Sequence, residues 1–452
     1  MFEGSNVLSK IFKVIDLVLC LFLLPILFIF SLCLLVYGRR SRLGAKKQSM
    51  LVLQAFHSYD SIIKSGHEEL ITQTDLDGFF KQVFTVYPIL GANPFDNVGS
   101  FKGASRQLKI NDIHTFFEYK MSIFDPVRFQ VLGFLLSQYL MLLHLRSLIL
   151  KEGISVIRGN CPFLTGFYSL ILSKWCRVPF SLRIGGNFDL MNQNGLMSYQ
   201  RIFKRYWVQK IIGRFVFKHA DNICAVNNNN LQYCIDNGAD PEKCKVIRYG
   251  NVVDYIHFTP PEGRKRGLID FDYTDKCVAL CVGRLTAVKH PEDVLKVTKL
   301  VSQIFPNILT VFIGEGELKI ELESSATREG ITDNVLFLGN RNQDYLAELY
   351  AISDVYLSPL TGRSMVEAGL AGLPLIAYDY EWHSEIVIPG QTGELVPYRS
   401  VEQMAEKLIT VLDDRAYLNK LGKGARDFTL DMMDKDKIRN QELDVFEQLI
   451  NV

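Results

Sequence analysis

The chain has 452 residues, of which 48% are hydrophobic, and its formal net charge at pH 7 is +1. This length allows two domains and an attachment segment. The composition excludes an intrinsically disordered chain, and the small net charge excludes a protein that binds nucleic acid in bulk. The nine cysteines and eight histidines are scattered, without the compact spacing of a metal site. We therefore expect reduced cysteines, no metal and no cofactor.

The first predicted element is an apolar segment from Val14 to Tyr37, long enough to span a bilayer. It lacks the small-residue cleavage site of a signal peptide, so we expect it to stay attached. A cationic flank follows at once, made of Arg39, Arg40, Arg42, Lys46 and Lys47. Positive charge marks the cytoplasmic side, so we predict that residues 1–47 attach the protein to the inner (plasma) membrane, with the rest of the chain in the cytoplasm.

Two topologies of this segment stay open. A single span places the N-terminus outside, whereas a re-entrant helix that turns at Pro25 leaves both ends in the cytoplasm. Lys10 and Lys13 on the near side favour the second. The stretch from Phe12 to Val18, with the central proline, also resembles the membrane helix of bacterial phosphoglycosyl transferases. That chemistry needs its own catalytic domain directly after the helix, which this sequence does not show.

From Ser49 onward, short apolar runs alternate with helical patterns, as in parallel βαβ units. The first series of predicted strands is Met50–Phe56, Val83–Tyr87, Ile154–Arg158, Phe180–Ile184 and Ile223–Val226. The second series is Cys277–Val282, Leu309–Ile313, Val335–Leu338, Val355–Leu357 and Pro374–Ala377. We predict an α/β fold with two Rossmann-like doubly wound domains facing a cleft.

The helix breakers Pro260 and Pro261 and the charged residues 264–266 mark the predicted boundary between these domains. The first domain then covers 48–262 and the second covers 263–430. A final helical segment, 431–452, can cross back to the first domain.

Arg284 and Lys289 follow a predicted strand of the second domain. An arginine fork and a lysine point charge at a strand end can both reach one diphosphate. A solvated basic loop is the alternative, and the pattern alone favours that alternative.

A glycine-containing loop and a predicted helix start near Ser364 or Met365 follow the strand that ends at Leu357. Free amides at a helix N-terminus attract an anion. Glu367 falls in the predicted first turn, where its carboxylate can accept bonds from ribose hydroxyls. Its alternative role is to stabilise the helix dipole.

In this order, these segments resemble the retaining GT-B glycosyltransferases of family 4, from about Asp221 to Tyr398. The motifs that carry this resemblance are Asp221–Val226, Val246–Asn251, Val282–Leu285 with Lys289, Ile313–Gly316, Phe337–Gly339, Glu367-Ala368 with Ala371–Pro374, Glu385–Val387 and Thr392–Pro397.

The resemblance implies a nucleotide-sugar donor. Arg284 and Lys289 would hold its diphosphate and Glu367 its ribose. Backbone amides of Gly362, Arg363, Ser364 and Met365 would complete the phosphate cradle. Asn340, which follows the motif ending at Gly339, is a further substrate-binding candidate.

The chain departs from the family in three places. A second glutamate eight residues before Glu367 is replaced by Pro359, and the histidine loop of the first domain has no histidine between 181 and 189. In that loop, Asp189 and Arg183 are the first catalytic candidates and Asn187 a binding candidate, with a structural salt bridge as the alternative role. The glycine-rich first loop is poorly matched, and Gly66 is the replacement candidate.

Between Asp189 and Asp221 there is no acidic residue, while aromatic residues interleave with cations. A basic, aromatic helix suits an anionic membrane surface. An ordinary solvated helix is the alternative. The cations are Arg201, Lys204, Arg205, Lys210, Arg214 and Lys218, and the aromatic residues are Phe203, Tyr206, Trp207, Phe215 and Phe217.

Together, these features predict a membrane-associated enzyme that transfers a sugar, with retention, to a lipid-linked or glycan acceptor in cell-surface polysaccharide or glycolipid synthesis. A catalytically inactive GT-B scaffold in a polysaccharide-assembly complex is the alternative, because Pro359 and the missing histidine depart from the family. The nucleotide base, the sugar, the acceptor, the linkage and the oligomeric state stay open.

Overall fold

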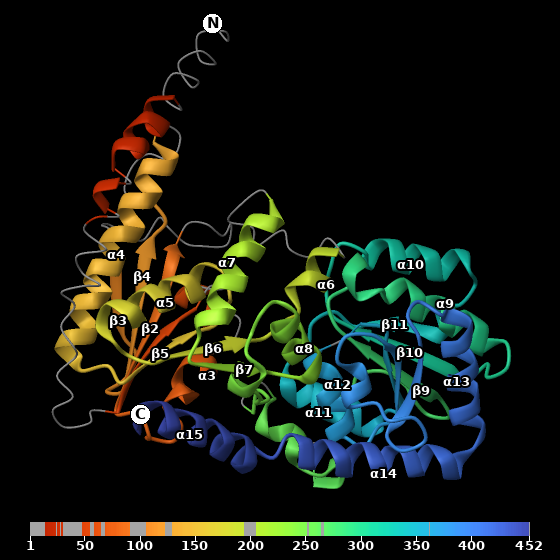
Figure 1. The fold of residues 1–452 in the computed structure, drawn as a ribbon. Coiled ribbons are helices and arrows are strands. Elements are labelled where there is room, and N and C mark those ends of the chain that lie inside the picture. Colours follow the sequence, from red (N-terminus) through yellow and green to blue (C-terminus); the bar gives the residue numbers. More distant parts are fainter. Residues whose placement is uncertain are drawn as a thin grey trace, which may run out of the picture. The chain divides into compact units, whose positions relative to one another are not determined.

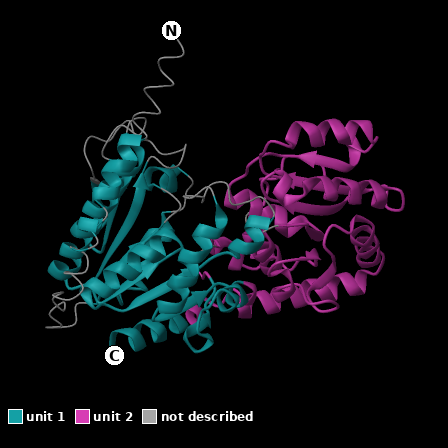
Figure 2. Cartoon of the chain, turned by 45° about the horizontal axis from the view of Figure 1, so that its top comes forward, with its two compact units in different colours: residues 1–226, 230–248, 439–452 teal, residues 227–229, 249–438 magenta. Residues whose placement is uncertain are grey.

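The structure, a computed structural model, describes residues 14–23, 25–27, 29, 48–54, 58–64, 68–90, 105–122, 129–193, 205–250, 253–263, 266–360 and 362–451. The chain divides into two compact units (Figure 2). The first unit comprises 1–226, 230–248 and 439–452, and the second comprises 227–229 and 249–438.

An eight-stranded sheet forms the centre of the first unit (Figure 1), and β3 is its antiparallel strand. The sheet is buried by helices on its faces, as parallel sheets usually are. The strands, in spatial order, are β3 (Ser105–Lys109), β4 (His114–Lys120), β2 (Gln82–Leu90), β1 (Ser49–Leu53), β5 (Val156–Gly159), β6 (Phe180–Ile184), β7 (Asn222–Ala225) and β8 (Cys244–Val246).

The helices of the first unit are α2 (Tyr59–Lys64), α3 (Glu69–Thr72), α4 (Gln130–Glu152), α5 (Leu164–Cys176), α6 (Phe188–Gln193), α7 (Tyr206–His219) and most of α8 (Asn228–Asp236). Leu145 and Ile149 of α4 and Leu172 of α5 share one apolar core with β1 and β2. This burial of aliphatic side chains is the main stabilising contribution of the layer.

The end of the chain belongs to the first unit. From residue 439 onward, α15 (Lys435–Asn451) packs on that unit, and the Phe446 ring lies edge-on to Phe80 with centroids 5.2 Å apart. Glu442 of α15 pairs with Arg158 of β5 at 3.2 Å. The C-terminal helix therefore completes the core of the first unit.

The second unit holds a six-stranded parallel sheet with the strand order of a Rossmann fold. Its strands, in spatial order, are β11 (Val335–Phe337), β10 (Ile308–Ile313), β9 (Cys277–Val282), β12 (Val355–Ser358), β13 (Leu375–Asp379) and β14 (Gly393–Pro397). Its helices are α9 (Pro291–Ser302), α10 (Lys319–Arg328), α11 (Gln343–Ile352), α12 (Arg363–Leu370), α13 (Val401–Asp413) and α14 (Arg415–Met432). The prediction of two Rossmann-like α/β domains is confirmed.

The border between the units lies at residue 249 and not at the predicted residue 263. The segment before the two prolines is held by the second unit, because Val253 is 3% exposed within its core. His257 is buried edge-on against Tyr350 and hydrogen-bonds to Gln343 at 2.7 Å. The other border falls at residue 438, after the predicted residue 430, because Met433 is still buried in the core of the second unit.

The apolar N-terminal segment is helical over the described part of Val14–Leu27, on both sides of Pro25. The cationic flank at residues 39–47 lies outside the described residues, so the two topologies remain predictions. Among the described residues, α4 is the one helix long and apolar enough to cross a bilayer by length and composition, although buried core helices meet the same criterion.

Candidate functional site

The strand order of the second unit reverses between β9 and β12. In open α/β sheets, ligands bind outside the carboxyl ends of the strands at such a switch point. Residues 283–290 follow β9, and residues 359–362 lead from β12 into α12. The sequence candidates of the second domain therefore gather at the carboxyl edge of one sheet. Asn340, which is exposed after β11, lies at the same edge but two strands away from β9.

The loop that carries Arg284 is fixed on both sides of that residue. The Gly283 amide donates to Ile313 O at 2.9 Å, and the Leu285 amide donates to Glu315 O at 3.0 Å. Gly314 has a φ of 135°, and a Cβ there would lie 2.0 Å from Gly283 O, so only glycine allows this approach. Arg284 is therefore an exposed side chain on a well-positioned loop.

Lys289 lies at the end of a 3-10 turn and is half-buried. Burial lowers the pKa of Lys289, the Glu381 carboxylate opposes this shift, and the positive charge of Arg284 adds to it. Burial likewise raises the pKa of Glu381, against the effect of Lys289. Glu381 has a left-handed backbone with a φ of 51° on the loop after β13. The sequence reasoning missed this carboxylate, because no motif singles it out.

The first turn of α12 is attached to the end of β9. The Ser364 hydroxyl donates to Val282 O at 2.8 Å, and the Tyr356 hydroxyl donates to Ser364 Oγ at 2.8 Å. A Cβ on Gly362, the N-cap residue, would meet no heavy atom within 4 Å. The helix N-terminus therefore has open space beside the residues that follow β9.

Met365 does not fit the predicted phosphate cradle. Its side chain is fully buried in the core, and its amide donates to Gly362 O at 3.1 Å. Because this amide already donates within the first helical turn, only the backbone amides before Met365 remain candidates for binding the phosphate.

Glu367 lies in the second turn of α12, because the helix begins at Arg363 and has no acidic residue in its first turn. The predicted first-turn position, and with it the helix-dipole alternative, is therefore wrong. Its carboxylate is 1% exposed. Tyr350 OH donates to Oε2 at 3.0 Å, and Arg363 Nε pairs with Oε1 at 2.9 Å. The Arg363 side chain, which contacts Oε1, is 36% exposed, whereas the Glu367 side chain is 2% exposed.

In the first unit, Arg183 has structural contacts. Its side chain is 3% exposed, donates to Arg248 O at 2.9 Å and pairs with Glu442 of α15 at 3.5 Å. Arg158 contacts the same carboxylate at 3.2 Å. This geometry corresponds to the alternative role, in which Arg183 forms a structural salt bridge.

Asp189 is also held by its neighbours. Its carboxylate pairs with Lys210 at 2.8 Å and accepts hydrogen bonds from Tyr206 and Asn237, each at 2.9 Å. Burial acts to raise the pKa of Asp189, but these donors outweigh burial and leave its pKa below the ordinary value. Asn187 accepts from the Leu190 amide at 3.2 Å and so caps α6, whereas Gly66 lies outside the described residues.

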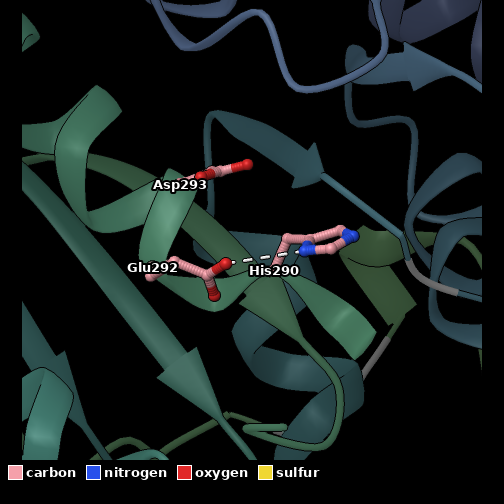
Figure 3. A group of neighbouring side chains, drawn as sticks. All are labelled: His290, Glu292 and Asp293. Atoms are coloured by element: carbon pink, nitrogen blue, oxygen red, sulfur yellow. Dashed lines mark ion pairs between the residues drawn. The ribbon is translucent and has the colours of Figure 1, made fainter. Parts of the chain in front are cut away.

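A separate cluster of side chains that could ligate a metal lies at the start of α9 and consists of His290, Glu292 and Asp293 (Figure 3). His290 and Glu292 form the ion pair drawn there, at 3.5 Å. The Arg399 guanidinium contacts Glu292 at 3.3 Å and Asp293 at 2.8 Å. A metal ion would have to displace this cation, so we interpret the group as an ion-pair network.

The basic, aromatic stretch forms α7 in the part that the structure describes. Trp207, Ile211 and Phe215 are 62%, 59% and 50% exposed, and their spacing of four places them on one helix face. Arg205, Arg214 and Lys218 are exposed as well. Other members of the predicted pattern are structural, since Phe217 is buried and Lys210 pairs with Asp189.

Comparisons with known proteins add independent information. Residues 271–428, which lie within the second unit, match the family described as Glycosyl transferases group 1. The sulfoquinovosyl transferase of Arabidopsis thaliana is 32% identical over 283 residues, which cover 61% of this chain and 53% of the plant protein. A GDP-mannose-dependent phosphatidylinositol monomannoside mannosyltransferase of Mycobacterium tuberculosis is 26% identical over 188 residues, which cover 39% of this chain and 49% of that protein. The chain therefore spans about half the length of these relatives.

Among solved structures, Anabaena HepE in complex with UDP and glucose superimposes with a TM-score of 0.63 at 18% identity, covering 88% of this chain and 99% of HepE. A sucrose-phosphate synthase from Thermosynechococcus elongatus superimposes with a TM-score of 0.65 at 17% identity, covering 89% and 99%. At this identity the likeness concerns the fold, which is GT-B with two Rossmann-like domains.

Proposed function

We propose that this chain is a membrane-associated glycosyltransferase that moves a sugar, with retention, from a nucleotide-sugar donor to a lipid-linked acceptor. The observation that carries the proposal is the common position of Arg284, Lys289 and the α12 N-terminus at the β9/β12 switch point of a matched glycosyltransferase group 1 domain. The similar mannosyltransferase depends on GDP-mannose, and HepE forms complexes with UDP, and both support a nucleotide-linked donor.

The positive charges at this edge suit a diphosphate leaving group. Negative charge develops on the departing phosphate as the glycosidic bond breaks, and preorganised donors stabilise it. The exposed Arg284 would bind the phosphates through its guanidinium group, and the half-buried Lys289 would contribute a single positive charge. The α12 N-terminus would add oriented backbone amides. Because these groups supply the charge, the proposed reaction requires no metal and no cofactor.

The donor ribose would lie at Glu367. Tyr350 fixes one carboxylate oxygen, and the partly exposed Arg363 leaves the second oxygen open to exchange. A ribose hydroxyl that donates to this oxygen would anchor the nucleoside beside the diphosphate. Retention would follow if the acceptor hydroxyl attacks from the face that the diphosphate leaves.

Membrane attachment supports a lipid-linked acceptor in cell-surface polysaccharide or glycolipid synthesis. The exposed apolar residues of the N-terminal helix and the cationic, aromatic face of α7 both suit a lipid surface. We place the protein at the inner membrane with its catalytic domains on the cytoplasmic side, because the cationic flank at residues 39–47 follows the apolar segment.

The test is to incubate membranes containing the protein with a panel of labelled nucleotide sugars. We expect one donor to transfer its label to the lipid fraction. Alanine at Arg284 or Lys289 should raise the barrier of that reaction by about 2–4 kcal/mol. Absence of transfer from every donor, or full activity of both variants, would contradict the proposal.

An inactive GT-B scaffold is the second candidate, and Pro359 is the observation that favours it, because it replaces the expected second glutamate. In that case the protein would transfer no sugar, while a partner enzyme of the same assembly would lose activity when the chain is deleted. If the Arg284→Ala protein, supplied in place of the deleted chain, restores the activity of the partner enzyme, the chain acts as a scaffold.

A further inference from the structure

The N-terminal helix and α4 are joined by an unusual cap. The carboxylate of Asp16 accepts hydrogen bonds from the amides of Val131 and Leu132, each at 2.9 Å. These amides belong to the first turn of α4, and Asp16 is 4% exposed. Figure 1 shows the N-terminal helix, in red, beside the upper part of α4. The carboxylate of a residue far upstream in the sequence therefore accepts the hydrogen bonds of the first backbone amides of α4.

Such a cap is normally local, since a side chain at the N-cap itself accepts from the first turn. Here the N-cap residue Phe129 forms no side-chain cap, and Asp16 is 115 residues away from Val131. In water, solvent satisfies the first amides of a helix. Within hydrocarbon no water is present, and every backbone donor needs an internal partner. The remote carboxylate provides that partner.

The surface around this cap is apolar and open. Val131 and Leu140 of α4 are 42% and 53% exposed, and no charged residue occurs between Gln130 and Leu143. The described part of the N-terminal helix exposes Val14, Ile15, Leu17, Val18, Leu19, Leu21, Phe22 and Ile26. Large apolar surfaces of this kind mark membrane or protein contacts.

The start of α4 is less buried than the rest of the helix. Of residues 130–136 only Gly133 is buried, whereas Met141, Leu145 and Ile149 are at most 1% exposed in the domain core. Ser137 and Gln138 already hydrogen-bond to the first unit, at Lys120 O (2.6 Å) and Pro88 O (3.1 Å). The most apolar window of the helix, which takes in parts of both halves, has a mean hydropathy of 1.4 and is 39% buried. The exposed side chains of residues 130–140 therefore form an apolar, open surface, while packing from Ser137 onward anchors the helix to the first unit.

We propose that the helix of Val14–Leu27 and residues 130–140 of α4 form one two-helix element that inserts into the lipid bilayer, with Asp16 as its latch. This inference rests on the membrane attachment included in the proposed function, and it adds a second inserted helix. The anchor is then continuous with the domain core through α4, so it fixes the first unit at the bilayer instead of tethering it loosely.

The experiment uses the full chain in vesicles whose acyl chains carry bromine, which quenches nearby tryptophan. Val131→Trp and Leu140→Trp place a probe on α4, and Ile320→Trp, at a 76% exposed position of α10, is the matched control. The natural tryptophans are present in every variant, so the emission added by each probe is compared with wild type.

We expect the added emission of both α4 probes to be mostly lost in brominated vesicles and that of the α10 probe to be retained. Equal quenching of the three probes would overturn the proposal. So would unquenched α4 probes together with concentration-dependent self-association, which would identify a second copy as the occupant of this surface.

The latch is tested by Asp16→Ala in the Val131→Trp background, with Leu17→Ala as the control, because Leu17 is exposed on the same helix and forms no cap. Asp16→Ala should reduce the quenching of the probe and Leu17→Ala should not, and equal effects would contradict the latch. Neither measurement involves a sugar donor. Loss of glycosyl transfer with normal quenching would therefore refute the proposed function alone, and the reverse result would refute the inserted element alone.

Discussion

Glu367 is the residue at which binding and structural roles give different results. Its carboxylate contacts Tyr350 and Arg363, and a buried glutamate of β14 has a similar environment. That second residue, Glu394, is 6% exposed, accepts from Tyr417 and pairs with Lys407 at 2.8 Å. The two glutamates form a matched pair, one at the proposed ribose site and one on the edge strand of the sheet.

We predict that Glu367→Gln weakens the binding of the cognate nucleoside diphosphate by about 1–3 kcal/mol, because the amide leaves a ribose hydroxyl badly paired. Glu394→Gln should leave the affinity unchanged. Calorimetric titration and thermal unfolding of both variants provide the measurement. If both variants bind as wild type does, Glu367 has no role at the ribose.

Glu381 gives a prediction about pH. Burial lowers the pKa of Lys289 and Glu381 counteracts this effect, so Glu381→Gln should lower the pKa of Lys289 further. Lys289 would then lose its proton, and its attraction for the diphosphate, at a lower pH. The alkaline limb of the pH profile of diphosphate affinity should therefore move to lower pH. If this limb does not move, Glu381 does not influence the protonation of Lys289.

The sequence predicted the positions of Arg284 and Lys289 in the fold better than the surroundings of the candidates in the first unit. Arg284 and Lys289 are recognisable because a strand end fixes their position along the chain. The partners of Arg183 and Asp189, by contrast, come from α15 and α7. Such long-range pairs depend on tertiary packing, so a sequence pattern cannot distinguish them from a catalytic pair.

At the scale of elements, the ten strands predicted from apolar runs all occur. Phe180–Ile184 and Cys277–Val282 have the predicted bounds, and the other eight have shifted ends. The missed strands were β3, β4, β8 and β14. The β3 sequence Ser105–Lys109 is mostly polar, as suits an antiparallel edge strand, and β8 has only three residues. Neither provides the apolar run on which the prediction relied.

The exposed face of α7 gives a prediction at this scale. Replacing Trp207, Ile211 and Phe215 by serine should weaken binding to anionic vesicles, because these side chains are exposed and would enter the lipid interface. Replacing Arg214 and Lys218 by glutamine should weaken binding mainly at low salt, where charges are least screened. Co-sedimentation over a range of salt concentrations measures both effects. Unchanged binding of both variants would assign α7 to the aqueous surface.

For the whole molecule, the alternation of strands and helices was sufficient to predict two Rossmann-like domains. The border was misplaced because Pro260 and Pro261 break a helix but do not end a domain. The 3-10 turn that begins at Pro261 belongs to the second unit, whose core already includes Val253. Local backbone signals indicate where an element ends, whereas packing decides to which core it belongs.

Deleting residues 1–47 gives a prediction for the whole chain. The core of the first unit should still fold, because Met141, Leu145 and Ile149 of α4 pack without the N-terminal helix. The first turn of α4 would lose Asp16, and its apolar face would be exposed to water. We expect a folded protein that self-associates unless detergent is present. If the truncated protein stays monomeric without detergent, the N-terminal helix is not needed to cover the apolar face of α4.

The proposed function requires that the β9/β12 edge of the second unit binds the donor diphosphate. Calorimetric titration of a nucleoside diphosphate and the matching monophosphate into wild type, Arg284→Ala and Lys289→Ala tests it most directly. We expect the diphosphate to bind wild type more tightly than the monophosphate does. Each substitution should remove about 1.5–3 kcal/mol of this affinity, as expected for a hydrogen bond to a charged group. Equal diphosphate binding by wild type and both variants would contradict it.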